Sequence, residues 1–229
     1  MNASLTLWQK YMQKSLVHKE EIFGFLIQPI LWVVLFGVGM RGLFSELLTD
    51  ERTDYITFML PGIIALTSID GAIGGGSTWL NERLRGMVKE YLVAPIPRLS
   101  ILMGNALAII TRSVGQAIGV LMGATLSGNP LHWLMGFLLM FGYGMGFSGI
   151  ALALASSTSS MGAYHSLIFI LNLPMLFLSN ALYPLFTLPG WMRIAALINP
   201  TTYVISGLRQ SLLKSDSLLG ETEWLPVWL

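Results

Sequence analysis

The sequence predicts an all-α, polytopic transmembrane helical bundle with five spans, an incomplete sixth span and an N-terminal interfacial helix. Two observations carry this prediction. Hydrophobic residues make up 54% of the chain and charged residues 11%, against about 25% charged residues in ordinary soluble domains. Several stretches also reach the roughly 20 apolar residues that a helix needs to cross the hydrocarbon core. We treat residues 1–229 as a single transmembrane domain.

Residues 1–21 are expected to form an amphipathic helix that lies in the membrane interface. Three lysines occupy its polar faces, and apolar side chains recur at helical spacing on another face: Leu5, Trp8, Met12 and Leu16. The segment lacks the continuous apolar core and cleavage site of a secretory signal, so we expect it to remain in the mature protein.

Five apolar stretches form the predicted spans. They cover residues 22–43, 55–80, 99–127, 133–155 and 161–182. Glycine and proline are common inside them, as in membrane helices whose backbones approach closely. Lys and Arg outside the spans favour the N-terminal side by seven to five, which predicts a cytoplasmic N-terminus. The hydroxyl-rich stretch between the last two spans is expected to cap helix ends in a second cytoplasmic turn.

Residues 81–98, NERLRGMVKEYLVAPIPR, place six charged side chains between the second and third predicted spans. The apolar residues of this segment fall on one face of a helix and the charges on the other. Asn81 is expected to cap the helix, with Glu82 in its first turn. Pro95 and Pro97 then end it, because proline lacks the backbone N–H. The segment is therefore either an interfacial loop helix or a docking helix for a cytosolic partner.

Two blocks of the sequence resemble the ABC-2 type exporter permeases, in particular their drug-resistance and nodulation-factor branch. In the second block, residues 178–212, a proline-bounded hairpin precedes an Asn-Pro pair and a helix with a late Arg. The two blocks stand in the expected order with the expected spans between them, so the resemblance covers nearly the whole chain. The first block is the charged segment, with Glu82, Arg85, Gly86, Glu90, Leu92, Pro95 and Arg98.

This resemblance implies that the chain is the permease half of an ATP-driven exporter and not an enzyme. The charged segment 81–98 would be the cytoplasmic coupling segment that docks onto a separate ATP-binding subunit. An amphipathic, drug-like or lipid- or glycan-linked substrate would leave across the cytoplasmic (inner) membrane between two permease halves, in a homodimer or a heterodimer surrounded by membrane lipids. ATP and Mg²⁺ would bind to the partner subunit, and no cofactor to this chain.

The glycine-rich stretch GAIGGGSTWL, residues 71–80, agrees with the expectation that ATP binds to the partner subunit and not to this chain. It has no lysine after its glycines and lies in an apolar span, so it is not a phosphate-binding loop. By the same resemblance, residues 183–210 would form an outer hairpin or lid, and a rigid packed cap is an equally acceptable interpretation. The residues assigned to this outer gate are Pro184, Pro189, Asn199, Pro200 and Arg209.

Asp70 and Arg112 are charged residues placed inside predicted spans, where an unpaired charge costs from a few to more than ten kcal/mol. They are expected either to pair with each other or to line a polar pathway. Two other classes of function depend on such groups. An ion-coupled secondary transporter needs intramembrane carboxylates, of which Asp70 is the one candidate. An intramembrane enzyme needs several polar catalytic side chains close together. Asp70 and His165 are weak candidates for such a set.

Composition excludes several further classes. A net charge of +1 gives no excess positive electrostatic potential that would attract nucleic acid. The chain contains no cysteine, so it forms no disulfide and no thiol-based site. Its three histidines are far apart in sequence without ligand spacing, so no metal site is predicted.

The last nine residues, ETEWLPVWL at 221–229, are typical of the opening of a sixth span. Six terminal apolar residues cannot cross a bilayer. We therefore expect the chain to lack the sixth span of the family it resembles and to have reduced activity for that reason.

Overall fold

The computed structural model describes residues 3–17, 19–39, 55–93, 97–121 and 130–213, and these residues contain helices but no strand. The helices of the bundle and of its inner end, the name used for the end that the sequence predicts to be cytoplasmic, are α1 (Ala3–Val17), α2 (Lys19–Gly39), α4 (Tyr55–Leu84), α5 (Met87–Val93), α6 (Arg98–Leu121), α7 (Pro130–Ser157) and α8 (Met161–Phe177). Three short helices follow: η1 (Leu185–Thr187), α9 (Gly190–Ile198) and α10 (Pro200–Leu213). The predicted all-α class is confirmed for these parts of the chain.

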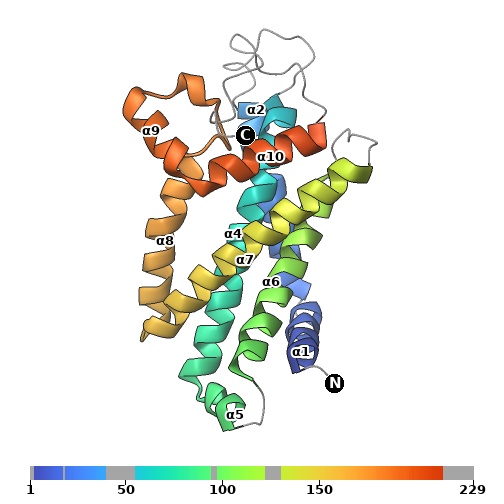
Figure 1. Ribbon diagram of the computed structural model, residues 1–229, viewed down its shortest axis with the longest axis vertical. Coiled ribbons are helices and arrows are strands. Elements are labelled where there is room, and N and C mark those ends of the chain that lie inside the picture. Colours follow the sequence, from blue (N-terminus) through green and yellow to red (C-terminus); the bar gives the residue numbers. More distant parts are fainter. Residues whose placement is uncertain (1–2, 18, 40–54, 94–96, 122–129, 214–229) are drawn as a thin grey trace.

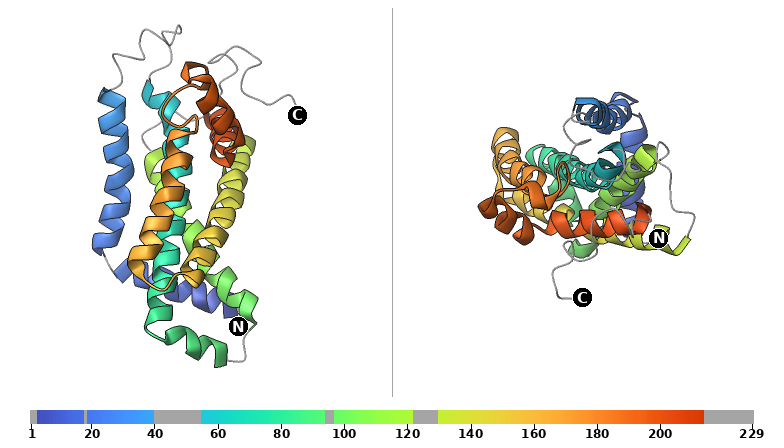
Figure 2. Two further views of the ribbon diagram at one scale, coloured as in Figure 1. Left: turned by 90° about the vertical axis from the view of Figure 1, so that its left-hand side faces the viewer. Right: turned by 90° about the horizontal axis from the view of Figure 1, so that it is seen from above.

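The long helices α4, α6 and α7 pack against one another to form the centre of the bundle (Figure 1). α2 stands beside α4, and α8 diverges from α7 after the turn that joins them. At one end of the bundle α1 lies crosswise beneath α6, near α5 (Figure 2). At the other end α9 and α10 lie across the tops of the long helices. The arrangement therefore has two distinct ends joined by an apolar middle.

Two of the described helices are long and apolar enough to cross a membrane, at Phe58–Leu84 and Leu134–Ser157. Shorter apolar helices occupy Ile27–Gly39, Leu99–Thr111 and Met161–Phe177, so helices lie at all five predicted positions. The count of five spans stays a prediction. The residues predicted to open a sixth span lie outside the described part of the chain.

Two predicted boundaries were wrong. The second span was expected to end at residue 80 and a new helix to begin at Asn81, whereas α4 continues without interruption to Leu84. Nothing between Trp79 and Leu84 disfavours a helix, and the break comes at Gly86, whose φ of 82° is left-handed. The fifth predicted span, expected to reach residue 182, ends as a helix at Phe177, after which the chain bends.

The helix predicted in residues 1–21 is present as α1, which ends at Val17. Trp8 and Met12 of the predicted apolar face are partly buried and pack with Leu7 and Tyr11, which are buried, whereas Leu5 is 54% exposed. A Cβ at Gly104 of α6 would come within 2.7 Å of the Leu7 Cβ, so the two helices touch closely there. α1 is thus packed onto α6, and its place in the membrane interface stays a prediction.

Glycines of α4 let other segments reach its backbone. A Cβ at Gly62 would lie 2.7 Å from both Cα and O of Ala181, and a Cβ at Gly76 would lie 2.9 Å from the Ala151 carbonyl oxygen. Contacts between backbones cannot be relieved by turning a side chain, so these positions admit only glycine without a shift of the helices. They fix α4 against the segment after α8 and against α7.

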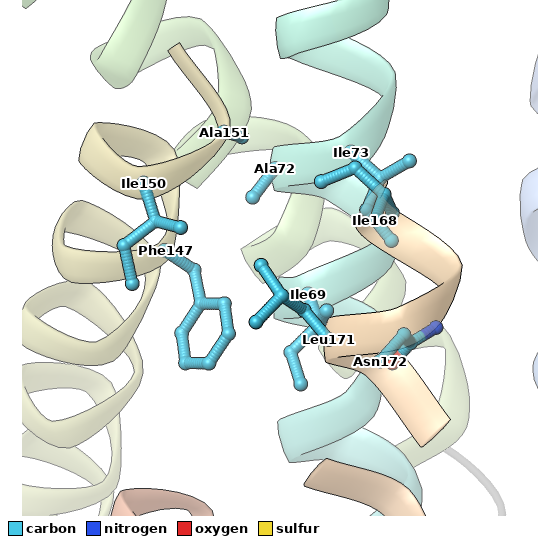
Figure 3. Close-up of a pocket in the computed structure, with 9 residues that line it drawn as sticks. All are labelled: Ile69, Ala72, Ile73, Phe147, Ile150, Ala151, Ile168, Leu171 and Asn172. Carbon is cyan, nitrogen blue, oxygen red and sulfur yellow. The ribbon is translucent and has the colours of Figure 1, made fainter. Parts of the chain in front are cut away.

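Between α4, α7 and α8, where the last two diverge, the side chains leave a pocket (Figure 3). Its lining includes Ile69 from α4, Phe147 from α7 and Leu171 from α8. The pocket lies along the middle of the three helices, away from both ends of the bundle.

We predict that Gly62→Ala lowers the stability of the fold by about 1–3 kcal/mol, since the added methyl group overpacks a backbone contact. Gly142→Ala is the matched control, because it is also a helical glycine and a Cβ there meets nothing within 4 Å. The thermal unfolding midpoint of each purified variant in detergent measures the difference. Equal midpoints would contradict the close approach at Gly62.

Candidate functional site

The candidate site is the inner end of α4 with the short helix α5 that follows it. The two helices are joined by a turn at Gly86, whose N–H donates to the Arg83 carbonyl at 3.0 Å. The Gly86 carbonyl in turn accepts from the Lys89 N–H at 3.1 Å. Nothing lies within 4 Å of a Cβ placed at Gly86, so the demand for glycine here comes from its left-handed φ and not from crowding. This turn sends α5 away from the axis of α4.

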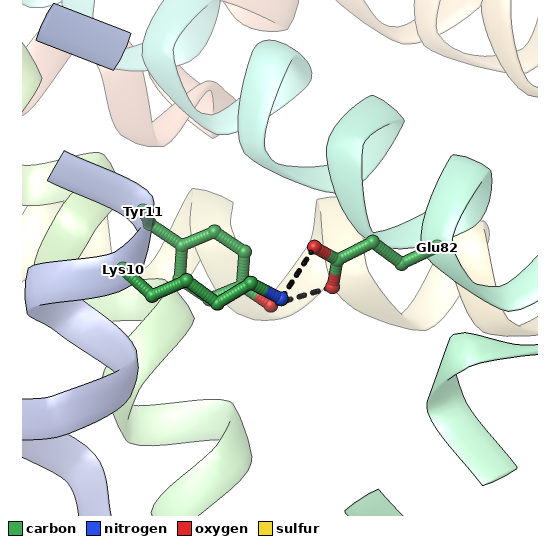
Figure 4. Close-up of polar contacts among 3 residues, drawn as sticks. All are labelled: Lys10, Tyr11 and Glu82. Atoms are coloured by element: carbon green, nitrogen blue, oxygen red, sulfur yellow. Dashed lines mark hydrogen bonds and ion pairs between the residues drawn. The ribbon is translucent and has the colours of Figure 1, made fainter. Parts of the chain in front are cut away.

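Glu82 is buried at the end of α4 with an exposed fraction of 1%. Its Oε1 lies 3.0 Å from the Lys10 Nζ, and its Oε2 accepts a hydrogen bond of 2.9 Å from the Tyr11 hydroxyl (Figure 4). A buried carboxylate needs such partners, because removing it from water is strongly unfavourable otherwise. Glu82 therefore ties α4 to α1 and does not lie on the surface as a direct docking residue.

Arg83, the next residue, ties α4 to the turn between α7 and α8. Its guanidinium donates to the carbonyl of Ala155 at 3.0 Å and to the carbonyls of Ser156 and Thr158. These carbonyls belong to the last turn of α7 and the residue after it, so the arginine caps that helix and complements its dipole. On the far side of the turn, Ser160 caps α8 by accepting from the Ala163 N–H, which confirms the predicted capping.

Several side chains of α5 and of the turn before it lie on the surface of this end. Arg85, Lys89 and Glu90 are exposed, and Val93 is 86% exposed. Arg85 also donates from Nε to Oδ1 of Asn81 at 3.0 Å, one helical turn earlier. The end of the bundle therefore presents charges of both signs beside an apolar side chain.

Three residues of the predicted coupling pattern are described only in part or not at all. Pro95 lies outside the described residues, and so does the side chain of Leu92. Arg98 begins α6, but its side chain is likewise outside the described part.

Sequence reasoning missed the most important partners in this site. Lys10 and Tyr11 lie 72 and 71 positions from Glu82, and no local pattern links residues at such distances. Arg83 was counted among the charges of the segment but was not assigned a partner. A signal did exist for it, since an arginine at a helix end opposite a hydroxyl-rich turn is a ready donor to exposed carbonyls.

At the outer end, Asn199 organises the predicted gate segment. Its Nδ2 donates to the carbonyl of Leu178 at 2.6 Å, just beyond α8, and its Oδ1 accepts from the Thr201 N–H at 2.9 Å in the first turn of α10. Pro200 follows as the first residue of α10, where its missing N–H is harmless. Pro184 and Pro189 precede η1 and α9 in extended backbone.

Arg209 fixes α10 to α4 at this end. It is 4% exposed, and its Nη2 donates to the carbonyls of Asn180 at 3.0 Å and Phe58 at 3.2 Å. The guanidinium carbon also lies 4.1 Å from the centre of the Phe58 ring, a cation–π distance. The structure therefore describes a packed cap over the long helices, which is compatible with the gate expected from the sequence.

Asp70 has a partner that the sequence did not reveal. Its Oδ2 accepts a hydrogen bond of 3.0 Å from Nε2 of Gln28 in α2. The side chain of Arg112 lies outside the described part of the chain, so the proposed pairing of Asp70 with Arg112 stays a prediction.

Comparison with known proteins decides the family. The family described as ABC-2 type transporter matches residues 3–213, nearly the whole described chain. The chain belongs to the ABC-2 type transporter family. It is therefore an integral membrane protein and the membrane subunit of an ABC transporter. Membership favours a transport subunit over both the ion-coupled carrier and the intramembrane enzyme considered from the sequence.

Named relatives agree with this family. The chain is 35% identical over 199 residues to a candidate transport permease of Porphyra purpurea, ycf38, covering 83% of this chain and 67% of that protein. It is 24% identical over 217 residues to the daunorubicin resistance ABC transporter permease DrrB1 of Streptomyces coeruleorubidus, covering 92% and 75%. It is 26% identical over 200 residues to the inner membrane transport permease YadH of Escherichia coli, covering 82% and 75%. The matched part spans about two thirds of the ycf38 protein.

We predict that Lys10 and Glu82 stabilise the permease as a pair. Lys10→Met leaves the carboxylate buried without its cation, and Glu82→Gln leaves Lys10 without its anion, so each single change should lower the unfolding free energy by about 1–3 kcal/mol. The double variant Lys10→Met/Glu82→Gln should lose less than the sum, because neither charge is then left behind. Thermal midpoints of the three variants in detergent form the cycle, and additive losses would refute the pairing.

Proposed function

We propose that this ABC-2 permease is one half of an ATP-driven exporter in the cytoplasmic (inner) membrane, with α5 docking onto a separate ATP-binding subunit. The observation that supports it best is the construction of the α4–α5 end. A helix of seven residues carries exposed charges, while two residues in the last turn of α4, Glu82 and Arg83, are bound to other parts of the bundle. A movement of α5 would therefore be transmitted to several helices at once.

Three connections would carry such a push. Glu82 leads to α1, Arg83 leads to the turn between α7 and α8, and α4 itself runs to the outer end. There Arg209 joins α4 to α10 through the Phe58 carbonyl. Movement of α5 together with the end of α4 would therefore carry α1 and the inner ends of α7 and α8 with it, and would reach the outer cap through α4.

Energy would come from the partner subunit, which would bind ATP and Mg²⁺. The glycine-rich stretch 71–80 lies within α4, where its backbone N–H groups belong to the helix and are not arranged as a phosphate-binding loop. This chain would hold no cofactor of its own. A second permease half, identical or different, would complete the path for an amphipathic, drug-like or lipid- or glycan-linked substrate.

The proposed orientation puts the N-terminus, α1 and α5 in the cytoplasm. α1 and α5 lie at the same end of the bundle, where an ATP-binding subunit of the cytosol would meet them (Figure 2). The outer gate would then be the cap formed by α9 and α10, with Asn199 and Arg209 holding it closed. The names inner membrane transport permease and daunorubicin resistance permease among the relatives support the location and the outward direction.

We predict that reversing the exposed charges of the docking surface, in the double variant Arg85→Glu/Glu90→Lys, lowers the amount of ATP-binding subunit that co-purifies with the permease at least fivefold. Both side chains are exposed and the fold does not depend on their burial, so the loss reports contact with the partner. Arg193→Glu is the matched control, because Arg193 is an exposed arginine of α9 at the opposite end. If the double variant is stable and co-purifies with an unchanged amount of the ATP-binding subunit, α5 is an interfacial loop helix and not a docking helix.

A further inference from the structure

Polar side chains follow one face of α4 from its inner end to its middle. Asp70, Ser77 and Asn81 are half-buried, and their spacing of seven and four residues puts them within an arc of about 40° on the helix. Along the helix axis, Asn81 and Asp70 are about 16 Å apart. We call this side of the helix the polar face of α4. It leads from the coupling end of the bundle to the depth of Asp70.

The packing of α4 leaves its polar face partly open between α2 and α8. On one side, the Ile73 carbonyl accepts a hydrogen bond of 2.9 Å from the Tyr164 hydroxyl of α8. On the other side, Oδ2 of Asp70 accepts a hydrogen bond of 3.0 Å from Nε2 of Gln28 in α2. The α6 helix packs elsewhere, because a Cβ at Gly75 would overlap a side chain of α6, and Gly75 lies about 140° around the helix from Asp70. The polar face therefore borders α2 and α8 and not α6.

The depth of Asp70 excludes lipid as the medium that the polar face meets. Asp70 lies near the middle of α4, and so at the depth of the hydrocarbon core. A charge that faces lipid at this depth costs from a few to more than ten kcal/mol, and ionisable groups inside spans therefore face partners or water-filled paths. In the proposed exporter, the path between two permease halves is such a place.

The chemistry at Asp70 selects a positively charged ligand. Among the described residues, its partner is the amide of Gln28, which is neutral and so orients the carboxylate without cancelling its charge. An ammonium group complements a carboxylate in both charge and hydrogen bonding, since it carries only donors. Leu66 and Ile73 are half-exposed beside Asp70 and offer apolar contacts. The site suits a molecule that carries an amine on an apolar body.

We propose that Asp70 binds the ammonium group of the exported substrate, so that the substrates of this permease are amphipathic amines. The amine enters at the inner end, follows Asn81 and Ser77 along the polar face, and reaches Asp70 at mid-membrane depth. The assignment of this amine as cargo rests on the proposed export function. Its binding to the permease does not, and the two are measured separately.

Binding is tested with tritiated tetraphenylphosphonium, an apolar cation, on the purified chain in dodecyl maltoside by scintillation proximity. Decylamine should displace this probe at least tenfold more effectively than decanol, which has the same apolar chain without the charge. Asp70→Asn should weaken binding of the probe at least tenfold, because it removes the negative charge. Asp70→Glu is the matched variant that keeps the charge, and its affinity should stay within about threefold of wild type.

Unchanged affinity in Asp70→Asn would overturn the proposal, and is the result expected if Asp70 only joins α4 to a neighbouring helix. Equal displacement by decylamine and decanol, or no displaceable binding to the wild type, would overturn it as well. Each variant is first shown to elute as one species with an unchanged thermal midpoint. If Asp70→Asn fails this check, Gln28→Lys keeps the carboxylate and places a competing ammonium beside it. That variant should also lose at least tenfold in affinity, and unchanged affinity would overturn the proposal.

Transport is measured on the permease assembled with its ATP-binding subunit in proteoliposomes. Binding through Asp70 without ATP-driven movement of the probe would count against the proposed export and leave the amine site standing. ATP-driven export of a neutral amphiphile by a permease that does not bind the cation would support the export and overturn the amine site.

Discussion

The buried carboxylate of Glu82 is the contact on which the inner end of this permease depends. It places a negative charge inside the protein at the last turns of α4, and it is held there by Lys10 and Tyr11 of α1. A charge in this position is acceptable only while its partners stay, so α1 and α4 must remain together. Arg83 makes the complementary connection to the carbonyls at the end of α7. Two adjacent residues thus hold one helix end between two other elements.

The rest of the bundle follows the same division between polar ends and an apolar middle. Asn199 and Arg209 concentrate hydrogen bonds to main-chain carbonyls at the outer end, where α9 and α10 cross the long helices. In the middle, contacts are made by apolar side chains and by glycines of α4. Hydrocarbon surroundings favour this arrangement, since an unsatisfied polar group costs several kcal/mol there.

Apolar runs predicted the all-α class and the positions of the main helices, because these depend on local composition. The family was predicted separately, from the resemblance of two blocks of the sequence to ABC-2 type permeases. The cap formed by Ser160 was also predictable from its sequence neighbours. The partners of Glu82 and Asp70 were not, since Lys10 and Gln28 reach them only through the packing of α1 and α2. The sequence places a helix start at Asn81, where the charged residues begin, whereas α4 continues to Leu84 and the left-handed turn at Gly86 separates it from α5.

If an ATP-binding subunit docks on α5 as proposed, α1, the end of α4 and α5 move as one unit when that subunit binds ATP. The chain contains no cysteine, so spin labels can be placed on Gln9→Cys and Lys89→Cys without background. Pulsed electron paramagnetic resonance would compare their separation in the assembled transporter without nucleotide and with trapped ATP. We expect an unchanged distance within this pair, and a changed distance from Lys89→Cys to a label on Arg193→Cys at the opposite end. A changed distance between positions 9 and 89 would contradict it.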